Sequence, residues 1–186
     1  MTTPLVAHLE KYLGVIEGGS GGGSPIKVVR FRGQPEPNVV TYVTLGLSRQ
    51  ALPMPNGRKV RQELLLSAHE RHDPANIASL LMTFGEYIAA QDRALLRGDV
   101  VGPSSPLMAG VQMNALYAAM PVFFPGEFAT FHGTSPPTVF VWMIPLHGSE
   151  AEFVKRSGWD AFEDNLESAD IDFWGLHRPP LQLSAG

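Results

Sequence analysis

The chain has 186 residues, of which 44% are hydrophobic and 17% are charged, a balance typical of a folded domain of modest size. Cysteine is absent, which excludes disulfide bonds, thiolate metal sites and a cysteine nucleophile, and fits the reducing cytoplasm. The net charge of −4 argues against direct nucleic-acid binding, which needs clustered Lys and Arg. The first residues lack the basic stretch of a signal peptide, and no apolar run is long enough to span a membrane.

The N-terminal residues predict a short amphipathic helix followed by a flexible segment. Thr3 and Pro4 form a helix start, Gly14 can end the helix, and between them an apolar stripe recurs at helical spacing: Leu5, Leu9, Tyr12 and Leu13. Residues 17–25, EGGSGGGSP, have the composition of a flexible loop or linker.

Three strands are expected next. Residues 26–32 read as the first, and residues 38–47 alternate apolar and polar side chains with the period of a strand. Pro55, Asn56 and Gly57 favour a chain reversal, after which residues 59–68 are expected to return as an antiparallel neighbour. Because Leu64, Leu65 and Leu66 run without alternation, this strand is expected at the centre of the sheet.

Helical and strand signals continue along the second half of the chain. Asp73 and Pro74 predict a helix start, and the apolar stripe that follows should pack on the sheet. Prolines break residues 99–106 and 121–137 into short strands and ordered loops, residues 113–119 favour a strand, and residues 138–144 form the last one. Ser149 and Glu152 have the spacing of a capping box, which predicts a helix start there, and Gly158 separates it from a second helical piece.

These elements together predict an α+β fold: a mixed, mainly antiparallel sheet with flanking helices in a single domain. We expect residues 1–25 to form an N-terminal helix and Gly/Ser-rich loop, residues 26–182 the main domain, and residues 183–186 a tail.

Two patterns suggest catalysis but lack the required context. The glycines around Ser20 match the letters of a nucleophile elbow, yet no strand precedes the serine and no helix follows it. His69 and His72 resemble a metal-binding motif, but they are three residues apart rather than four and lie before a helix start. A metal-dependent hydrolase using His69 and His72 therefore ranks as the weakest alternative, and we expect no catalytic residue, metal site or cofactor.

The C-terminal part is rich in acidic and aromatic residues. Residues 148–172 contain eight acids against Lys155 and Arg156, so the rest of the chain is slightly basic. An acidic run of this kind is most often a solvated helix face; the alternative is an interface for a basic partner. The aromatic residues of the segment FFPGEF, Trp142 and Trp159 are interpreted as core. The residues expected at a partner surface are Glu163, Asp164, Glu167, Asp170, Asp172, Phe173 and Trp174.

Several motifs resemble one known family. The segments PPTVFVWMIPLHGSEAEFVKRSGWDAFEDNLE and DFWGLHRPP are similar to the Suppressor of fused domain in its bacterial, single-domain form. VTLGLSR, RQELLLSAHE and PVFFPGEFATF precede them in the expected order, so the similarity covers about residues 28–181.

The resemblance implies an α+β domain without enzymatic activity. The animal relative binds transcription factors of the Hedgehog pathway, and bacterial relatives are proposed as immunity proteins of polymorphic toxin systems. The leading hypothesis is therefore a non-catalytic immunity protein that neutralises a toxin by direct binding, with a basic toxin domain as its partner. The alternative is a regulator that captures a peptide by strand addition at a sheet edge.

Overall fold

The computed structural model describes residues 3–184 of the chain. Within them lie four α-helices, two short 3-10 helices and nine strands. In the N-terminal half these are α1 (Pro4–Leu13), β1 (Gly18–Ser20), β2 (Lys27–Arg32), β3 (Val39–Leu45), η1 (Leu47–Arg49), β4 (Leu52–Pro53), β5 (Lys59–His69) and α2 (Pro74–Gln91). In the C-terminal half they are β6 (Val100–Val101), β7 (Ala115–Ala119), η2 (Gly126–Ala129), β8 (Thr130–Phe131), β9 (Thr138–Leu146), α3 (Gly148–Ser157) and α4 (Trp159–Ser168).

The strands form one mixed sheet in the order β1-β2-β3-β5-β9-β7-β6, with β4 on β5 and β8 on β9. Every pairing is antiparallel except that of β5 with β9, whose register runs from Arg61 opposite Thr138 to Leu65 opposite Trp142. This arrangement confirms the predicted α+β fold with a mainly antiparallel sheet in a single domain. It also confirms the central position of β5, whose leucines are buried on both faces.

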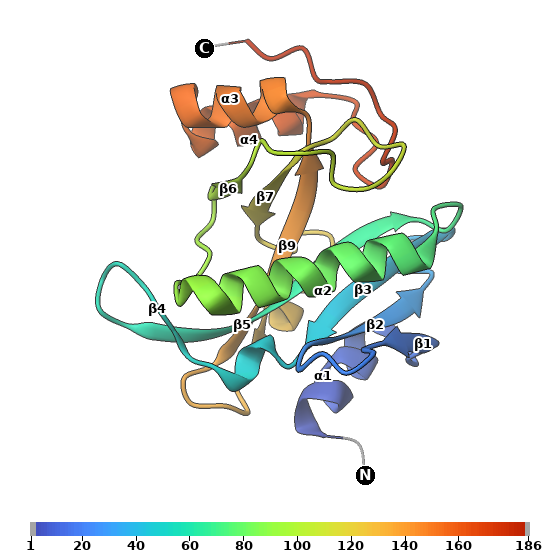
Figure 1. The fold of residues 1–186 in the computed structure, drawn as a ribbon, viewed down its shortest axis with the longest axis vertical. Coiled ribbons are helices and arrows are strands. Elements are labelled where there is room, and N and C mark those ends of the chain that lie inside the picture. Colours follow the sequence, from blue (N-terminus) through green and yellow to red (C-terminus); the bar gives the residue numbers. More distant parts are fainter. Residues whose placement is uncertain (1–2, 185–186) are drawn as a thin grey trace.

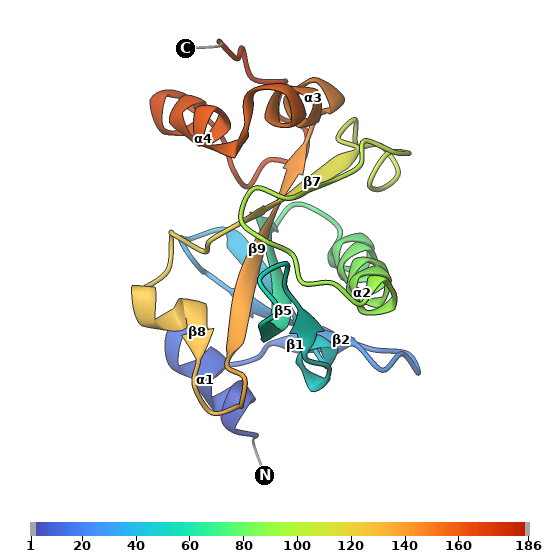
Figure 2. The same ribbon diagram turned by 90° about the vertical axis from the view of Figure 1, so that its left-hand side faces the viewer.

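Helices cover both faces of the sheet. In Figures 1 and 2, α2 lies across one face and α1 lies on the opposite side, while α3 and α4 cover the end of the sheet near β7. One face of β3 and β5, with Tyr42 and Leu64, packs against α2. The other face, with Val43 and Leu65, belongs to a second core. Leu9 of α1 and Phe162 of α4 also belong to that core. Successive side chains of these strands therefore point alternately into two buried cores, one on each face of the sheet.

Local signals placed most elements correctly. The side chain of Thr3 caps α1, and Asp73 accepts a hydrogen bond from the Ala75 backbone at the start of α2. The expected reversal near Gly57 is the turn of the β4–β5 hairpin, where the Met54 N–H donates to the Arg58 carbonyl at 2.8 Å. None of the helices within residues 3–184 combines the length and apolar character that crossing a membrane requires.

The structure corrects the glycine-rich segment. Gly18–Ser20 are not part of a flexible loop but form β1, which pairs antiparallel with residues 28–30 of β2. Glycine is a poor strand former, so the ordering comes from the neighbouring strand rather than from local preference. The predicted tail, 183–186, lies partly outside the described residues.

The predicted capping box is also wrong. Helix α3 begins at Gly148 with His147 as its N-cap residue, and Glu150, not Glu152, accepts the hydrogen bond from the His147 backbone at 2.9 Å. The pattern of Ser149 and Glu152 predicts a helix start two residues later than the one observed. Burial of Glu150 favours the observed start, in which its carboxylate caps the helix.

Candidate functional site: an apolar pocket beside helix α4

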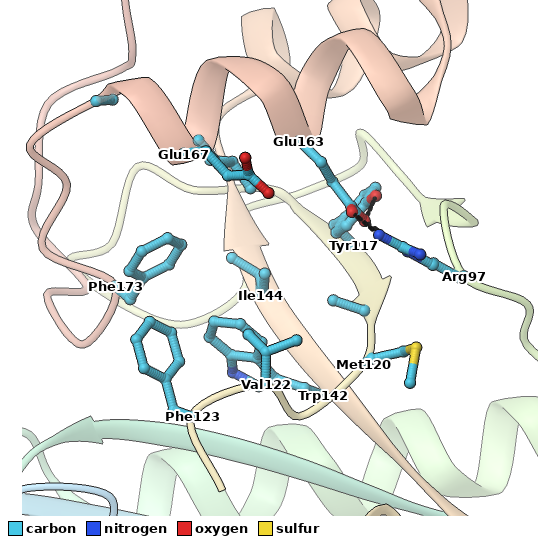
Figure 3. A pocket seen from close by; sticks show the side chains of 13 residues that line it. Arg97, Tyr117, Met120, Val122, Phe123, Trp142, Ile144, Glu163, Glu167 and Phe173 are labelled. Atoms are coloured by element: carbon cyan, nitrogen blue, oxygen red, sulfur yellow. Dashed lines mark hydrogen bonds and ion pairs between the residues drawn. The ribbon is translucent and has the colours of Figure 1, made fainter. Parts of the chain in front are cut away.

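A pocket of ≈ 480 Å³ opens between the outer part of the sheet, α4 and the loop after β7 (Figure 3). Its floor is the β7–β9 pair, its roof is α4, and its two sides are formed by residues 120–123 and by Phe173. The lining residues are Arg97, Tyr117, Ala119, Met120, Val122, Phe123, Trp142, Ile144, Glu163, Leu166, Glu167, Ala169 and Phe173.

One end of the pocket is a cluster of aromatic rings. Phe123 meets Trp142, Phe173 and Trp174 with ring centroids 5.3, 5.3 and 5.0 Å apart, each near an edge-to-face arrangement. These distances and angles are those that aromatic pairs prefer. The cluster joins β9 to the C-terminal segment and makes this end of the pocket apolar.

The loop after β7 forms an exposed apolar lip. Met120 is 51% exposed, Val122 72% and Phe123 46%, and all three border the pocket. Single exposed apolar side chains are ordinary, whereas a contiguous group beside a cavity is typical of a binding surface. We therefore treat the pocket and its lip as the candidate functional site.

The opposite end is polar and held by one carboxylate. Glu163 of α4 accepts hydrogen bonds from the Arg97 guanidinium and, at 2.7 Å, from the Tyr117 hydroxyl (Figure 3). Burial acts to raise the pKa of Glu163, but the bonds from Arg97 and Tyr117 outweigh it and hold that pKa below the usual range. Burial, and then the Glu163 carboxylate, raise the pKa of the Tyr117 hydroxyl, so it remains a proton donor.

Arg97 is fixed from a second direction. Its guanidinium lies over the ring of Trp159 with 4.5 Å between the guanidinium carbon and the ring centroid, a cation–π contact. The sequence interpretation placed Trp159 in the core, and this is wrong: the side chain is 38% exposed. Trp159 instead positions the charged group at the polar end of the pocket.

The structure brings together three of the seven residues predicted at a partner surface. Glu163, Glu167 and Phe173 line the pocket. Trp174 lies behind Phe123 and is only 6% exposed, so its predicted place on a surface is wrong.

The other three predicted residues lie apart from the pocket lining. Asp164 and Asp170 are exposed nearby. Asp172 contacts His69, with 2.9 Å between the His69 Nε2 and the nearer carboxylate oxygen, and so ties the C-terminal segment to the end of β5.

The aromatic segment FFPGEF divides between core and surface. Phe124 and Phe128 are buried as predicted, whereas Phe123 is exposed at the lip. Pro121 and Pro125 lie on either side of the exposed residues. Two prolines so close together indicate a surface loop, and this is the sequence feature that points to exposure of Phe123. Arg97 and Tyr117 had no recognisable motif, because they reach Glu163 only through the tertiary fold.

The histidines considered as metal ligands have other contacts. His72 Nε2 accepts a hydrogen bond from the Leu176 backbone at 3.3 Å, and the rings of His69 and His72 lie 6.5 Å apart. Across residues 3–184, no group of three or more His, Asp or Glu side chains is placed to hold a metal ion. The contacts instead connect the end of β5 to the C-terminal segment.

Comparison with known sequences identifies the family. The family described as Suppressor of fused protein (SUFU) matches residues 22–179, which is most of the chain. The chain belongs to the Suppressor of fused family. The match includes β2 to β9 and both C-terminal helices, so it contains the whole pocket.

Solved structures of Suppressor of fused proteins share the fold. A homologue from Neisseria gonorrhoeae FA 1090 has a TM-score of 0.75 at 15% identity, with 95% of this chain and 93% of that chain covered. A chain in the Sufu–Fu complex gives a TM-score of 0.67 at 16% identity, covering 89% and 82% of the two chains.

Drosophila Suppressor of Fused gives a TM-score of 0.60 at 17% identity over 77% of this chain and 38% of that protein. At such identities the likeness shows a common fold alone. No curated protein sequence matches the chain.

Proposed function

We propose that this chain is a non-catalytic protein-binding domain, and that its partner is a basic toxin domain which it neutralises in the cytoplasm as an immunity protein. The observation that carries the proposal is the exposed apolar lip beside an aromatic pocket on an acidic helix. Apolar anchors that enter a pocket, surrounded by polar groups, contribute most of the binding energy in protein interfaces. The Sufu–Fu complex is a precedent for protein binding by this fold.

Charge favours a basic partner. Helix α4 carries Asp160, Glu163, Asp164 and Glu167 and no basic residue. Arg97 neutralises Glu163, whereas none of the other three forms an ion pair with any residue between 3 and 184. A toxin that acts on nucleic acid needs a basic surface to bind phosphates, and an acidic helix would attract and cover such a surface.

Peptide capture by strand addition is the second candidate. Strand β9 pairs with β8 as far as Val139 and with β7 from Trp142, so Phe140 and Val141 lie between these two partners. A smaller cavity of ≈ 190 Å³ opens at this interruption. The outer strands β1 and β6 have only three and two residues, which offers an added strand little backbone to pair with.

Co-expression tests the proposal. The chain and the toxin domain encoded beside its gene are produced in a host that the toxin kills, and growth and co-purification are measured. We expect the wild-type chain to bind the toxin and restore growth. The variant Val122→Asp should lose protection, because a charge on the lip must be desolvated on binding.

A matched control separates the lip from general surface effects. Val15 is 77% exposed and lies outside the pocket, so Val15→Asp should protect fully. A wild-type chain that neither binds nor protects would show that immunity is the wrong function. Full protection by Val122→Asp would show that the toxin binds elsewhere.

A further inference from the structure

The two ends of the pocket offer different chemistry to an occupant. Phe123, Trp142 and Phe173 form an apolar end, and the Arg97–Glu163 pair forms a polar end (Figure 3). Glu167 lies on α4 between them, with its carboxylate directed toward the cavity. Along the pocket, the aromatic cluster is therefore followed by the Glu167 carboxylate and then by the Arg97–Glu163 ion pair.

The free charge in the pocket is negative. The Arg97 guanidinium forms an ion pair with Glu163 and a cation–π contact with Trp159, so its charge is already balanced within the chain. Glu167 is exposed, and no residue from 3 to 184 forms an ion pair with it. A ligand cation would find a carboxylate at this position, whereas a ligand anion would find no uncommitted positive group.

The size of the pocket fits a polypeptide side chain with its neighbours. A volume of ≈ 480 Å³ is within the range of about 300–1,000 Å³ over which proteins bind small ligands. The aromatic end offers apolar surface to a large apolar side chain, since Phe123 is 46% exposed and Phe173 is partly exposed.

We propose that the pocket recognises a segment of the partner that carries a large apolar side chain directly beside a Lys or Arg. The apolar side chain packs in the cavity against the wall formed by Phe123, Trp142 and Phe173, and the cation pairs with Glu167. This assignment rests on the proposed protein-binding function and specifies the chemistry of the partner.

Two other occupants fit less well. An acidic or phosphorylated peptide would place its charge against Glu167 and the acids of α4. A second copy of this chain would form an isologous contact in which two acidic α4 helices face each other, since a two-fold axis pairs the same patch with itself. The charge pattern therefore favours a different, basic chain.

Three synthetic peptides of equal length test the assignment, with Phe-Lys, Phe-Glu or Ala-Lys at the centre of a Gly-Ser sequence. Binding to the ¹⁵N-labelled chain is followed by NMR through the Val122 and Phe123 amides and the Trp142 indole. We expect saturable shifts with the Phe-Lys peptide, and affinity about two- to fivefold lower with Phe-Glu, the ratio typical of one exposed ion pair. The Ala-Lys peptide should bind at least tenfold more weakly, because it lacks the apolar anchor.

Variants connect the preference to one carboxylate. Glu167→Gln should remove the preference for Phe-Lys over Phe-Glu, and Glu167→Lys should reverse it. Glu152→Gln on α3 removes an exposed carboxylate outside the pocket and should leave both affinities unchanged. Equal binding of Phe-Lys and Phe-Glu to the wild-type chain, or shifts confined to another surface, would overturn the assignment.

The peptide result and the toxin result can fail separately. Loss of protection in Val122→Asp together with no peptide preference would leave the protein-binding function intact and remove the proposed motif. A clear peptide preference without toxin protection would keep the motif and remove the toxin as partner.

Discussion

Glu150 and Arg178 form a buried ion pair that fastens the C-terminal segment to the start of α3. Arg178 Nη1 donates to Glu150 Oε1 at 2.6 Å, and Nη2 donates to Oε2 at 2.8 Å. The side chains are 0% and 5% exposed, and the same carboxylate accepts the backbone N–H of His147 and of Leu181. Because Phe173 belongs to the segment held by this pair, the ion pair also supports one wall of the pocket.

Removal of Arg178 should destabilise the fold severely. Arg178→Ala leaves the Glu150 carboxylate buried without its cation, a change that typically costs about 3–5 kcal/mol in the free energy of unfolding. Urea unfolding followed by circular dichroism measures the loss. Arg58→Ala, at an exposed arginine with no ion pair among the described residues, should change stability by less than about 0.5 kcal/mol. A loss below about 1 kcal/mol for Arg178→Ala would mean that the pair is not buried in solution.

A second buried glutamate, Glu63 of β5, has the opposite dependence on pH. Its carboxylate accepts hydrogen bonds from Thr44 and Ser48 side chains, both at 2.6 Å, and from the Gly46 and Ser48 backbone. Burial raises its pKa despite these bonds, which act to lower it. For Glu150, by contrast, burial is outweighed by Arg178, and the pKa is lowered.

The raised pKa of Glu63 predicts a specific pH slope. Its contribution to stability is complete below the unfolded carboxyl pKa of about 4.3 and is lost as pH rises through the folded-state pKa. The free energy of unfolding of the wild type, relative to that of Glu63→Gln, should therefore decrease as pH increases. Unfolding from about pH 4 to pH 8 measures it, with Glu36→Gln at an exposed site as control. A difference that stays flat with pH would contradict the raised pKa.

Local sequence patterns predict those helices and strands whose boundaries or burial depend on residues within the element itself. Asp73 and Pro74 mark the start of α2, and the uninterrupted leucines of β5 mark a strand buried on both faces. Composition predicts a loop at Gly18–Ser20, because the strand there depends on pairing with β2, which no local pattern reveals. The capping pattern predicts a start of α3 that is two residues too late, because two similar patterns overlap and burial of Glu150 decides between them.

The candidate site was only partly predictable for the same reason. The charge and aromatic content of the C-terminal segment pointed to Glu163, Glu167 and Phe173, which line the pocket. Arg97 comes from a distant loop, and its contact with Glu163 spans 66 residues of sequence. A long-range contact of this kind requires the sheet order and the placement of α4, neither of which composition or periodicity provides.

Gly98 leaves free the space that the side chain of Trp159 occupies, and its replacement should disturb the polar end of the pocket. The residue has φ +90°, and a Cβ there would lie 2.6 Å from side-chain atoms of Trp159. Gly98→Ala therefore combines backbone strain with a clash, at a cost of about 1–3 kcal/mol in stability. Urea unfolding and tryptophan fluorescence measure the effect, and Gly110→Ala, at φ +77° where a Cβ meets no atom within 4 Å, is the matched control. Equal stability of the two variants would show that Trp159 is free to move away.

His72 is the acceptor that links the end of β5 to the C-terminal segment. Its Nε2 accepts the Leu176 backbone N–H at 3.3 Å, and its ring centroid is 5.4 Å from that of His177. Burial lowers the pKa of His72, and three neighbouring positive or titratable groups lower it further, while Asp172 acts to raise it. Those three neighbours are Arg71, His177 and His69.

Mild acid should loosen this link. With a folded-state pKa below the unfolded value of about 6.5, His72 contributes stability that is present above that value and lost as pH falls through the folded-state pKa. Protonation removes the acceptor for the Leu176 N–H and places a second positive charge beside that of Arg71. Between about pH 7.5 and pH 5 the Leu176 amide shift should titrate in the wild type but not in His72→Gln, whose carbonyl remains an acceptor. His132→Gln, at an exposed histidine, should retain the wild-type titration. An unchanged Leu176 amide in the wild type would show that His72 stays neutral across this range.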